Sequence, residues 1–325
     1  MKNPENYAKI LEKAIKYMSL NFSIKYLKPV CAPCVNYTFL ASKCKDSVPE
    51  MVLKIKDGNS SNFNRERQAM QLYNAVGVPV PTEIHFDNSY DYWNTEIIIY
   101  EFIPNKPVNP DKFPYKQMGY TMSIMHRIAG NGFGLIDPDS WIGTNKTWEE
   151  FLYLRASNGK RKNLTENYLG VKINNFLKNI GELDLVPKPR LLHLDYNPAN
   201  VILGNNNQLY VIDPVGALGD PLMDVANSII NLEDYERKEF LLGYHYDMEL
   251  SPKEIEALSI YETVAILNKL GNVLTYKEEL KCKSLEDTIT HWLDGKVESW
   301  LERERRYLKR LDVLYPKLMS ERKYI

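Results

Sequence analysis

The chain has 325 residues, of which 44% are hydrophobic and 11% aromatic, so it is long enough for two lobes and apolar enough for a sizeable core. Its 41 basic and 42 acidic residues leave a formal net charge of −1, which excludes a global electrostatic attraction to nucleic acid or to an anionic membrane. The 22 tyrosines argue against disorder for most of the chain.

The N-terminal stretch reads as a helix. Charged and amide residues interrupt positions 2–20, so there is no uninterrupted apolar core of a signal peptide. An amphipathic helix is predicted by the helical spacing of Tyr7, Ile10, Leu11, Ala14, Ile15 and Met18. No stretch has the length and apolarity of a membrane span. We expect a cytoplasmic protein with neither membrane nor nucleic acid as a partner.

Two of the four cysteines, Cys31 and Cys34, form a C-x-x-C pattern. Such a pattern can indicate metal or redox chemistry, but no second pair or close histidine pair completes a zinc site. No thioredoxin-like βαβ pattern surrounds it either. We expect these residues, with Cys44 and Cys282, to be free thiols in a reducing compartment.

The first third of the chain is predicted to be rich in strands. Residues 22–56 have the pattern of a strand meander, which is clearest at 51–56, and a helix is expected over 62–75. Gly77 ends that helix, and an apolar strand follows at 96–102. Prolines at 104, 107 and 110 then break regular structure. We place a lobe boundary there, with an N-terminal lobe at 1–103.

The remainder is predicted to be mainly helical. Residues 115–129 carry Met118, Met122, Met125 and Ala129 on one helical face, and 281–325 are expected to be helical. The exception is a compact strand region at 190–213. The fold class is therefore α+β and bilobed, with a small β-rich lobe and a larger helical lobe at 104–325.

Residues 191–214, LLHLDYNPANVILGNNNQLYVIDP, carry the strongest motif. His193, Asp195 and Asn200 fit H-x-D-x-x-x-x-N, and Asp213 ends the next apolar run. A turn at 204–207 joins two short strands. If Val201 faces Ile212 and Leu203 faces Tyr210, then Asn200 and Asp213 lie side by side at the open end of the hairpin, and Asp195 lies on the loop leading into it.

This set of side chains suits phosphoryl transfer. A carboxylate and an amide oxygen form a hard-oxygen site for Mg²⁺ at Asn200 and Asp213. Asp195 can accept the proton of a substrate hydroxyl. Phosphoryl transfer needs a metal, a base and a positioned phosphate, and little covalent work from the protein. The motif therefore predicts a kinase that transfers a phosphoryl group to a hydroxyl.

The N-terminal lobe should hold the nucleotide. Lys54 lies mid-strand among apolar residues and needs an anion there. Glu66 is the acid on the helical face formed with Phe63, Met70 and Tyr73, so a Lys54–Glu66 ion pair is predicted to direct the lysine at the α- and β-phosphates. Three further nucleotide contacts are expected from position in the chain, namely a phosphate contact at Asn36 and backbone contacts to adenine at Glu101 and Ile103.

Three residues are predicted to support the catalytic loop. Asp220 followed by Pro221 reads as an N-cap with proline at the first helical position. Asp224 lies in apolar company and needs a hydrogen-bonded partner, so we expect it to brace the Asp195 loop rather than to bind substrate. His193 is expected to orient the loop, and His126 to be a packed core histidine.

These motifs resemble the aminoglycoside phosphotransferase family of the protein-kinase-like superfamily. The matching pieces run in family order over about residues 20–230, from VLK (52–54) and GVPVP (77–81) through YEFIPN (100–105) and HLDYNPANVIL (193–203) to VIDPVGALGDPLMDVA (211–226). IDPVGALGDP is similar to the streptomycin-kinase branch. The resemblance implies Asp195 as catalytic base, Asn200 and Asp213 as magnesium ligands, Lys54 with Glu66 as the phosphate clamp, and ATP as co-substrate, with GTP left open.

The sequence departs from the family pattern at three points. Leu194 stands where a glycine often follows the motif histidine, Asp213-Pro214-Val215 replaces Asp-Phe-Gly, and the expected phosphate loop at 29–40 has no glycine.

The acceptor stays open. An aminoglycoside or related antibiotic, whose phosphorylation gives resistance, is the first expectation, with acidic residues at 231–240, Asp247, Glu249, Glu254, Glu256 and Glu262 available for a cation. A metabolic kinase for choline, homoserine or a sugar is the alternative, and a nucleotide-binding regulator without catalysis is a third. A protein kinase is disfavoured, because no long activation segment follows Asp213. The oligomeric state is not indicated.

Overall fold

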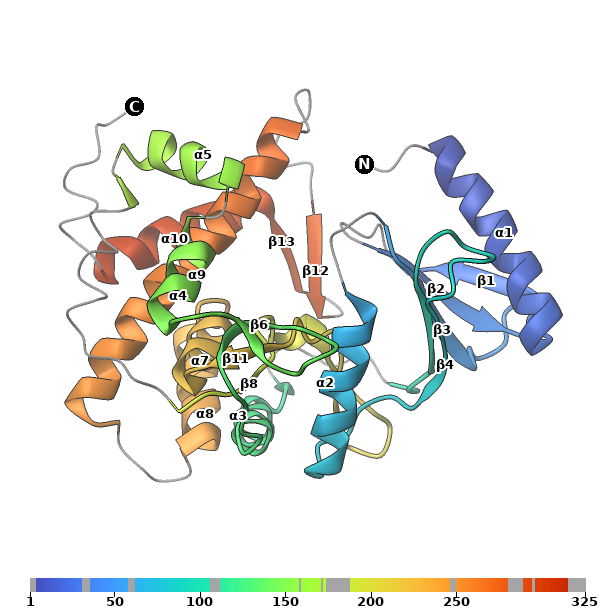
Figure 1. Cartoon of the computed structure of the whole chain (residues 1–325), viewed down its shortest axis with the longest axis horizontal. Coiled ribbons are helices and arrows are strands. Elements are labelled where there is room, and N and C mark those ends of the chain that lie inside the picture. Colours follow the sequence, from blue (N-terminus) through green and yellow to red (C-terminus); the bar gives the residue numbers. More distant parts are fainter. Residues whose placement is uncertain are drawn as a thin grey trace.

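The computed structural model describes residues 4–30, 36–57, 62–105, 112–157, 159–170, 172–173, 188–245, 250–279, 289–293 and 296–314. Cys31, Cys34, Cys282, Asp247 and Glu249 lie outside these residues, so the expectations for them stay predictions. The described chain forms a β-rich lobe and a larger helical lobe, which confirms the predicted bilobed α+β fold (Figure 1).

The N-terminal lobe is an antiparallel sheet with a helix on each face. Its strands are β1 (Tyr26–Pro29), β2 (Tyr37–Ser42), β3 (Met51–Ile55), β4 (Glu83–Asp87) and β5 (Ile97–Glu101), in the order β1-β2-β3-β5-β4. Helix α1 (Pro4–Phe22) lies on the outer side, and α2 (Phe63–Ala75) lies between the sheet and the C-terminal lobe (Figure 1).

The alternation of side chains along β5 explains why both faces of this sheet are covered. Ile97 and Ile99 pack in a cluster with Ala14 and Met18 of α1, whereas Ile98 packs with residues of α2. Successive side chains of a strand point to opposite faces. A strand whose residues are apolar at every position therefore needs a helix on both sides, and α1 and α2 supply them.

The C-terminal lobe combines helices with short strands. The helices are α3 (Tyr115–Met125), α4 (Trp148–Ala156), α5 (Gly159–Leu169), α7 (Pro221–Ile229), α8 (Asp234–His245), α9 (Pro252–Glu279) and α10 (Trp300–Leu314). A four-stranded sheet has the order β7-β6-β11-β8, from β6 (Phe133–Ile136), β7 (Gly143–Asn145), β8 (Arg190–Leu192) and β11 (Ala217–Gly219). A separate hairpin joins β9 (Val201–Leu203) to β10 (Leu209–Val211), and a second joins β12 (Ile289–Leu293) to β13 (Lys296–Ser299).

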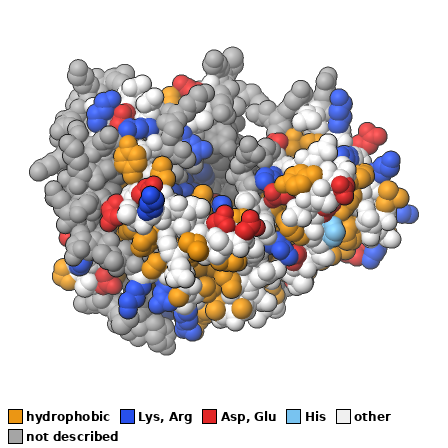
Figure 2. All heavy atoms as spheres, viewed as in Figure 1, with side chains coloured by type: hydrophobic (Ala, Val, Ile, Leu, Met, Phe, Trp, Pro, Cys, Tyr) orange, Lys and Arg blue, Asp and Glu red, His pale blue; other side chains and the backbone are white. Residues whose placement is uncertain are grey.

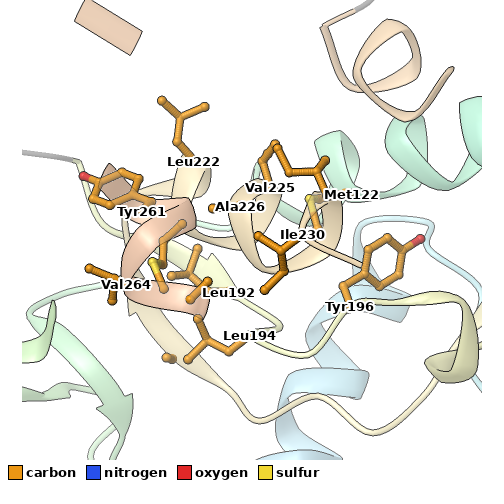
Figure 3. Packing of buried hydrophobic residues seen from close by; sticks show 14 of the residues in the cluster. Met122, Leu192, Leu194, Tyr196, Leu222, Val225, Ala226, Ile230, Tyr261 and Val264 are labelled. Carbon is orange, nitrogen blue, oxygen red and sulfur yellow. The ribbon is translucent and has the colours of Figure 1, made fainter. Parts of the chain in front are cut away.

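The core of this lobe lies directly under the motif loop. Side chains from α3, β8, α7 and α9 converge there with Leu194 and Tyr196 of the motif itself (Figure 3). Leu194 and Tyr196 are both buried, whereas Asp195 between them is not. The loop is thus anchored by two apolar side chains that leave the intervening carboxylate facing outward.

The hairpin over residues 201–211 forms, but its predicted register is wrong by one residue. Val201 pairs with Val211 and Leu203 with Leu209, rather than with Ile212 and Tyr210. The reason is that the Gly204 N–H donates to the Gln208 carbonyl at 2.9 Å, so Gly204 lies opposite Gln208 and residues 205–207 form the turn. The open end of the hairpin still brings Asn200 beside the residue before Asp213, because Ile212 N–H donates to Asn200 O.

Two predicted helical segments are also corrected. Helix α3 ends at Met125, and Ala129 instead forms a β-bridge with Arg190. Within the segment 281–325, residues 289–299 contribute a β-hairpin, and α10 begins at Trp300. The strands β6, β7 and β11 had no counterpart in the predicted pattern, because strands of three or four residues are too short to show a period.

The surface seen in Figure 2 carries Lys and Arg interspersed with Asp and Glu among its coloured residues, and it is hollowed between the two lobes. This mixture agrees with the near-zero net charge. Among the helices that the structure describes, none combines the length and apolar character that crossing a bilayer requires.

Candidate active site

A lysine and two carboxylates link the two lobes. Lys54 Nζ on β3 lies 2.7 Å and 2.8 Å from the carboxylate oxygens of Glu66 on α2, and 2.7 Å from Oδ1 of Asp213 in the C-terminal lobe. Tyr100 OH donates to Glu66 at 3.2 Å. Burial alone would lower the pKa of Lys54, but the Asp213 and Glu66 carboxylates outweigh it and raise that pKa. Lys54 is therefore a permanent cation at the junction of the lobes.

An apolar pocket lies next to this lysine. It has a volume of about 300 Å³ and receives residues from both lobes and from the connection between them. Its lining includes Leu40 and Val52 from the sheet, Ile202 and Ile212 from the hairpin, and Glu101 to Ile103 from the connection. An apolar pocket of this volume that ends at Lys54 and Asp213 can hold a nucleotide base, with the charged phosphates directed at the lysine.

Asp195 lies on the motif loop, and Asn200 and Lys269 hold its carboxylate. Asn200 Nδ2 donates to Asp195 Oδ2 at 2.9 Å and to the Asp195 carbonyl at 2.8 Å. Lys269 Nζ on α9 lies 2.6 Å from Asp195 Oδ1. Burial alone would raise the pKa of Asp195, but Lys269, with smaller contributions from His193 and Asn200, holds it below its usual value. Asp195 is thus an ionised carboxylate with a fixed orientation.

Asp224 on α7 braces the motif loop from below. Its two carboxylate oxygens accept the backbone N–H groups of His193 at 2.6 Å and Leu194 at 2.5 Å, and His126 Nε2 lies 3.2 Å from Oδ2. The Asp224 side chain is fully buried, so a direct contact with substrate is excluded in this conformation. The expected structural role of Asp224 agrees with these contacts.

The backbone at Leu194 has a conformation that favours glycine. Leu194 has φ of 61°, in the left-handed region that disfavours residues with a Cβ atom. Its N–H is held by Asp224, and its side chain is buried in the core shown in Figure 3. Burial of the leucine side chain offsets the backbone strain, so the loop keeps its shape without glycine.

His193 connects the loop to the hairpin. Its Nε2–H donates to the Ile212 carbonyl at 2.9 Å, and its Nδ1 accepts the Asp195 N–H at 3.3 Å. Burial lowers the pKa of His193, which keeps the ring neutral and able to accept at Nδ1. These contacts agree with an orienting role rather than with that of a base.

Asp220 caps α7 as its sequence predicts. Its side chain accepts the Leu222 N–H at 3.0 Å, with Pro221 in the first turn, and it accepts the hydroxyl proton of Tyr261 at 2.8 Å. Trp148 Nε1 in turn donates to Tyr261 OH at 2.9 Å. The cap therefore ties α7 to α4 and α9, the helices that surround the site.

Asn200 and Asp213 fit a magnesium ion by the chemistry of their free atoms. Because the Asn200 amide nitrogen is used toward Asp195, its Oδ1 is the atom left for a cation. Asp213 has a half-exposed side chain, of which Lys54 contacts one oxygen. The described residues contain no group of three or more His, Cys, Asp or Glu that could hold a metal by itself. Two protein oxygens completed by substrate phosphates is the usual arrangement for Mg²⁺.

The remaining predicted nucleotide contacts are less uniform. Glu101 and Ile103 line the pocket, but the Glu101 N–H already donates to Thr82 O at 2.9 Å. Asn36 does not line the pocket; its Oδ1 accepts the Asp57 N–H at 3.4 Å. Of the expected phosphate loop at 29–40, residues 31–35 lie outside the described chain, and residues 37–40 belong to β2. The phosphate contact of Asn36 stays a prediction.

Lys269 was missed in the sequence although it carries a recognisable signal. It lies in the run TVAILNKLGNVL, where a lysine among apolar residues needs an anion, as at Lys54. It is the one residue of 261–270 that is not buried. No motif adjoins Lys269, and Asp195 lies 74 positions away, so the sequence alone does not connect the two residues.

Comparison with known proteins identifies the family of this chain. The fructosamine kinase family model matches residues 7–280. A search of curated protein sequences finds no match.

Among solved structures, a candidate fructosamine-3-kinase from Haemophilus somnus 129PT has a TM-score of 0.61 and 16% identity, covering 93% of this chain and 97% of that one. The aminoglycoside phosphotransferase APH(4)-Ia, in a ternary complex with AMP-PNP and hygromycin B, has a TM-score of 0.63 and 17% identity, over 93% and 97% of the two chains.

A choline/ethanolamine kinase family protein from Mesorhizobium loti has a TM-score of 0.58 and 14% identity, covering 96% of this chain and 97% of that one. At these identities the likeness shows the fold, and the family model identifies the group. The protein is an ATP-dependent phosphotransferase that acts on a hydroxyl group of a small molecule, and it belongs to the fructosamine kinase family.

Proposed function

We propose that this enzyme transfers the γ-phosphoryl group of ATP to a hydroxyl of a sugar-amine adduct of the fructosamine type, with Mg²⁺ as the metal. The observation that carries the proposal is the placement of Lys54 and Asp213 at one end of a nucleotide-sized pocket, with Asn200 and Asp195 hydrogen-bonded to each other in the motif that precedes Asp213. The family match supports a sugar-like acceptor.

Each of these residues has a task in the proposed reaction. Lys54 contacts the α- and β-phosphates, and Asn200 and Asp213 hold the metal, which neutralises charge on the phosphate oxygens. Asp195 accepts the proton of the acceptor hydroxyl. A bond forms between that oxygen and the γ-phosphorus, the bond from the γ-phosphorus to the β–γ bridging oxygen breaks, and ADP leaves with the electron pair.

An aminoglycoside acceptor is the second candidate, because several similar folds bind such antibiotics. One is APH(4)-Ia with hygromycin B; another is APH(9)-Ia with ADP and spectinomycin, at a TM-score of 0.56 and 16% identity over 95% of this chain and 98% of that one. The sequence resemblance to the streptomycin-kinase branch also favours this second candidate.

Three of the acidic residues expected to bind a polycation are engaged elsewhere. Glu262 is buried and holds both Arg237 and Arg310. The Glu254 carboxylate accepts the Ser251 N–H at the start of α9. Glu236 accepts the hydroxyl of Tyr115 at 2.7 Å. These contacts favour the sugar-amine acceptor over a polycationic one.

A direct test is ADP release by the purified protein with ATP and Mg²⁺ against a panel of fructosamines, aminoglycosides, choline, homoserine and simple sugars. We expect turnover with fructosamines that Asp195→Asn abolishes. Turnover confined to aminoglycosides would select the second candidate. Nucleotide binding without turnover on any acceptor would contradict a kinase and favour a regulator.

A further inference from the structure

Three side chains hold the Asp195 carboxylate, and they hold its two oxygens unequally. Oδ1 accepts from Lys269 Nζ at 2.6 Å and from Asn197 Nδ2 at 3.3 Å, whereas Oδ2 accepts from Asn200 Nδ2 at 2.9 Å. An ionised carboxylate has about four lone-pair sites, two on each oxygen. Among the contacts that the described residues make, both sites of Oδ1 are therefore occupied and one site of Oδ2 stays open.

The two asparagines fix the plane of this carboxylate against its own backbone. Asn197 Nδ2 and Asn200 Nδ2 each donate a second time to the Asp195 carbonyl, both at 2.8 Å. Each amide nitrogen has two N–H groups, so both amides are fully used as donors on Asp195. The asparagines therefore set the orientation of the carboxylate but treat its two oxygens alike. Only the contact with Lys269 distinguishes Oδ1 from Oδ2 among the described residues.

Lys269 reaches Asp195 from a helix whose place is set by the core. Val264, five residues earlier on α9, packs in the same cluster as Leu194 of the motif loop (Figure 3). Asn268 Nδ2 donates to the carbonyl of Arg155 on α4 at 2.8 Å, which ties this turn of α9 to a second helix. The packing of the C-terminal lobe, and not the motif loop itself, therefore fixes the start of the Lys269 side chain.

The partial exposure of this ion pair argues against a role in stability alone. The side chains of Lys269 and Asp195 are 22% and 36% exposed. A pair that water reaches contributes little to the free energy of unfolding. The same exposure leaves the carboxylate accessible to an acceptor. Because an ammonium already occupies Oδ1, an acceptor hydroxyl that approaches Asp195 finds its open lone pair on Oδ2.

We propose that Lys269 is a positioning residue of the phosphoryl transfer: by occupying Oδ1 of Asp195, it makes Oδ2 the atom that accepts the proton of the acceptor hydroxyl. Oδ2 is bound by Asn200, the residue whose own Oδ1 is left for the metal, so the hydroxyl is directed toward the metal-binding residue. As the hydroxyl oxygen bonds to the γ-phosphorus, its proton passes to Oδ2 and ADP leaves with the electron pair of the broken bond. This inference rests on the proposed kinase function and adds a residue and a reacting atom to it.

The kinetics of a neutral variant of similar length test this role. Lys269→Met should lower kcat by about 10- to 100-fold, because a small misplacement of a reacting group slows the reaction that much. KM for ATP, the affinity for ADP and the melting temperature should stay close to those of the wild type. Lys269→Arg, which restores a cation beside Oδ1, should recover most of kcat. Lys238→Met, at an exposed lysine on α8, is the matched control and should change none of these quantities. Wild-type kcat in Lys269→Met, or a loss of kcat that comes with an equal loss of ADP affinity and a lower melting temperature, overturns the inference.

A double variant separates positioning from an independent contribution. If Lys269 acts through the carboxylate, Lys269→Met should cause no further loss of turnover in an Asp195→Ala background. Single-turnover assays with labelled ATP measure this slow residual reaction, and a further loss in the double variant overturns the proposed route. The crystal structure of the wild type with AMP-PNP, Mg²⁺ and the acceptor then identifies the reacting atom. We expect the acceptor hydroxyl on Oδ2 with Lys269 retained on Oδ1; a hydroxyl on Oδ1 with Lys269 displaced overturns the assignment.

The inference and the proposed acceptor class fail in different ways. If the wild type phosphorylates no fructosamine, the proposed function fails, and the same variants are compared with whichever acceptor of the panel is turned over. If no acceptor is turned over, they are compared in ATP hydrolysis, in which water takes the place of the acceptor hydroxyl. A lower rate in Lys269→Met that Lys269→Arg restores supports the inference in either case. Equal rates in Lys269→Met and the wild type, or no reaction in the wild type, overturn it.

Discussion

The ammonium of Lys54 on β3 lies 2.7 Å from the carboxylate of Asp213, a residue 159 positions later in the other lobe. The same ammonium is held from behind by Glu66 on α2, and the side chains of Lys54 and Glu66 are each 8% exposed. These linked ion pairs connect the two lobes at the nucleotide pocket and give the site a cation before any ligand binds.

Lys54→Met should lower kcat/KM for ATP by about 10²–10³-fold, because a positioned cation on the transferring phosphates is lost. It should also destabilise the fold by about 3–5 kcal/mol, because Glu66 is left buried without its partner. Lys54→Met with Glu66→Met should recover most of this stability while remaining inactive. Urea unfolding and ADP-release assays measure both. Equal stability of the single and double variants would contradict a coupled pair.

Asp195→Ala should reduce turnover by about 10²–10⁴-fold, since the proton acceptor and the orienting contact are both removed. Binding of ADP should change little, because Asp195 does not line the nucleotide pocket. Steady-state kinetics with the best acceptor, combined with ADP titration, separates the two effects. Wild-type turnover in this variant would refute the assigned role.

Removal of Mg²⁺ should weaken nucleotide binding to the wild type, and Asn200→Ala and Asp213→Ala should each abolish most of that dependence. The physical reason is that each variant removes one of two protein oxygens from the metal. Calorimetric titration of ADP with Mg²⁺ and with EDTA measures it. Equal affinity under both conditions in the wild type would count against a metal at this position.

Asp224→Asn should destabilise the protein by roughly 2–4 kcal/mol and reduce turnover, because the amide NH₂ replaces one of the two accepting oxygens and would face a backbone N–H, donor against donor. Asp139→Asn, at an exposed position, is the matched control and should change neither. Thermal unfolding and acceptor kinetics provide the measurement. A variant as stable as the control would show that the loop holds its shape without Asp224.

Leu194→Gly should be more stable than Leu194→Ala by about 1 kcal/mol, the reverse of the usual order of these two residues. Both variants lose the buried side chain, which costs about 2–5 kcal/mol, but glycine alone relieves the left-handed backbone at φ of 61°. Chemical denaturation of the two variants side by side tests this. An alanine variant of higher stability would indicate that the backbone there is unstrained.

Several elements of the fold and site could be predicted because their contacts are local. The hairpin over 201–211 was identifiable from its turn residues, yet its register was not, since the N–H of Gly204 donates to the carbonyl of Gln208 and leaves only 205–207 in the turn. The segment 289–299 was predicted as helix from apolar spacing, and it pairs as strands instead. Spacing alone cannot separate the two outcomes over so short a run.

The sequence by itself determined the chemistry: a lysine in an apolar strand, an acid on an apolar helical face, and an ordered set of Asp195, Asn200 and Asp213 around a turn. Each of these follows from the need of a buried charge for a partner or from contacts a few residues apart. Only the tertiary structure decided what surrounds Asp195. Lys269 reaches it from α9, 74 positions later in the chain, and packing between distant segments is set by the whole core rather than by any local pattern.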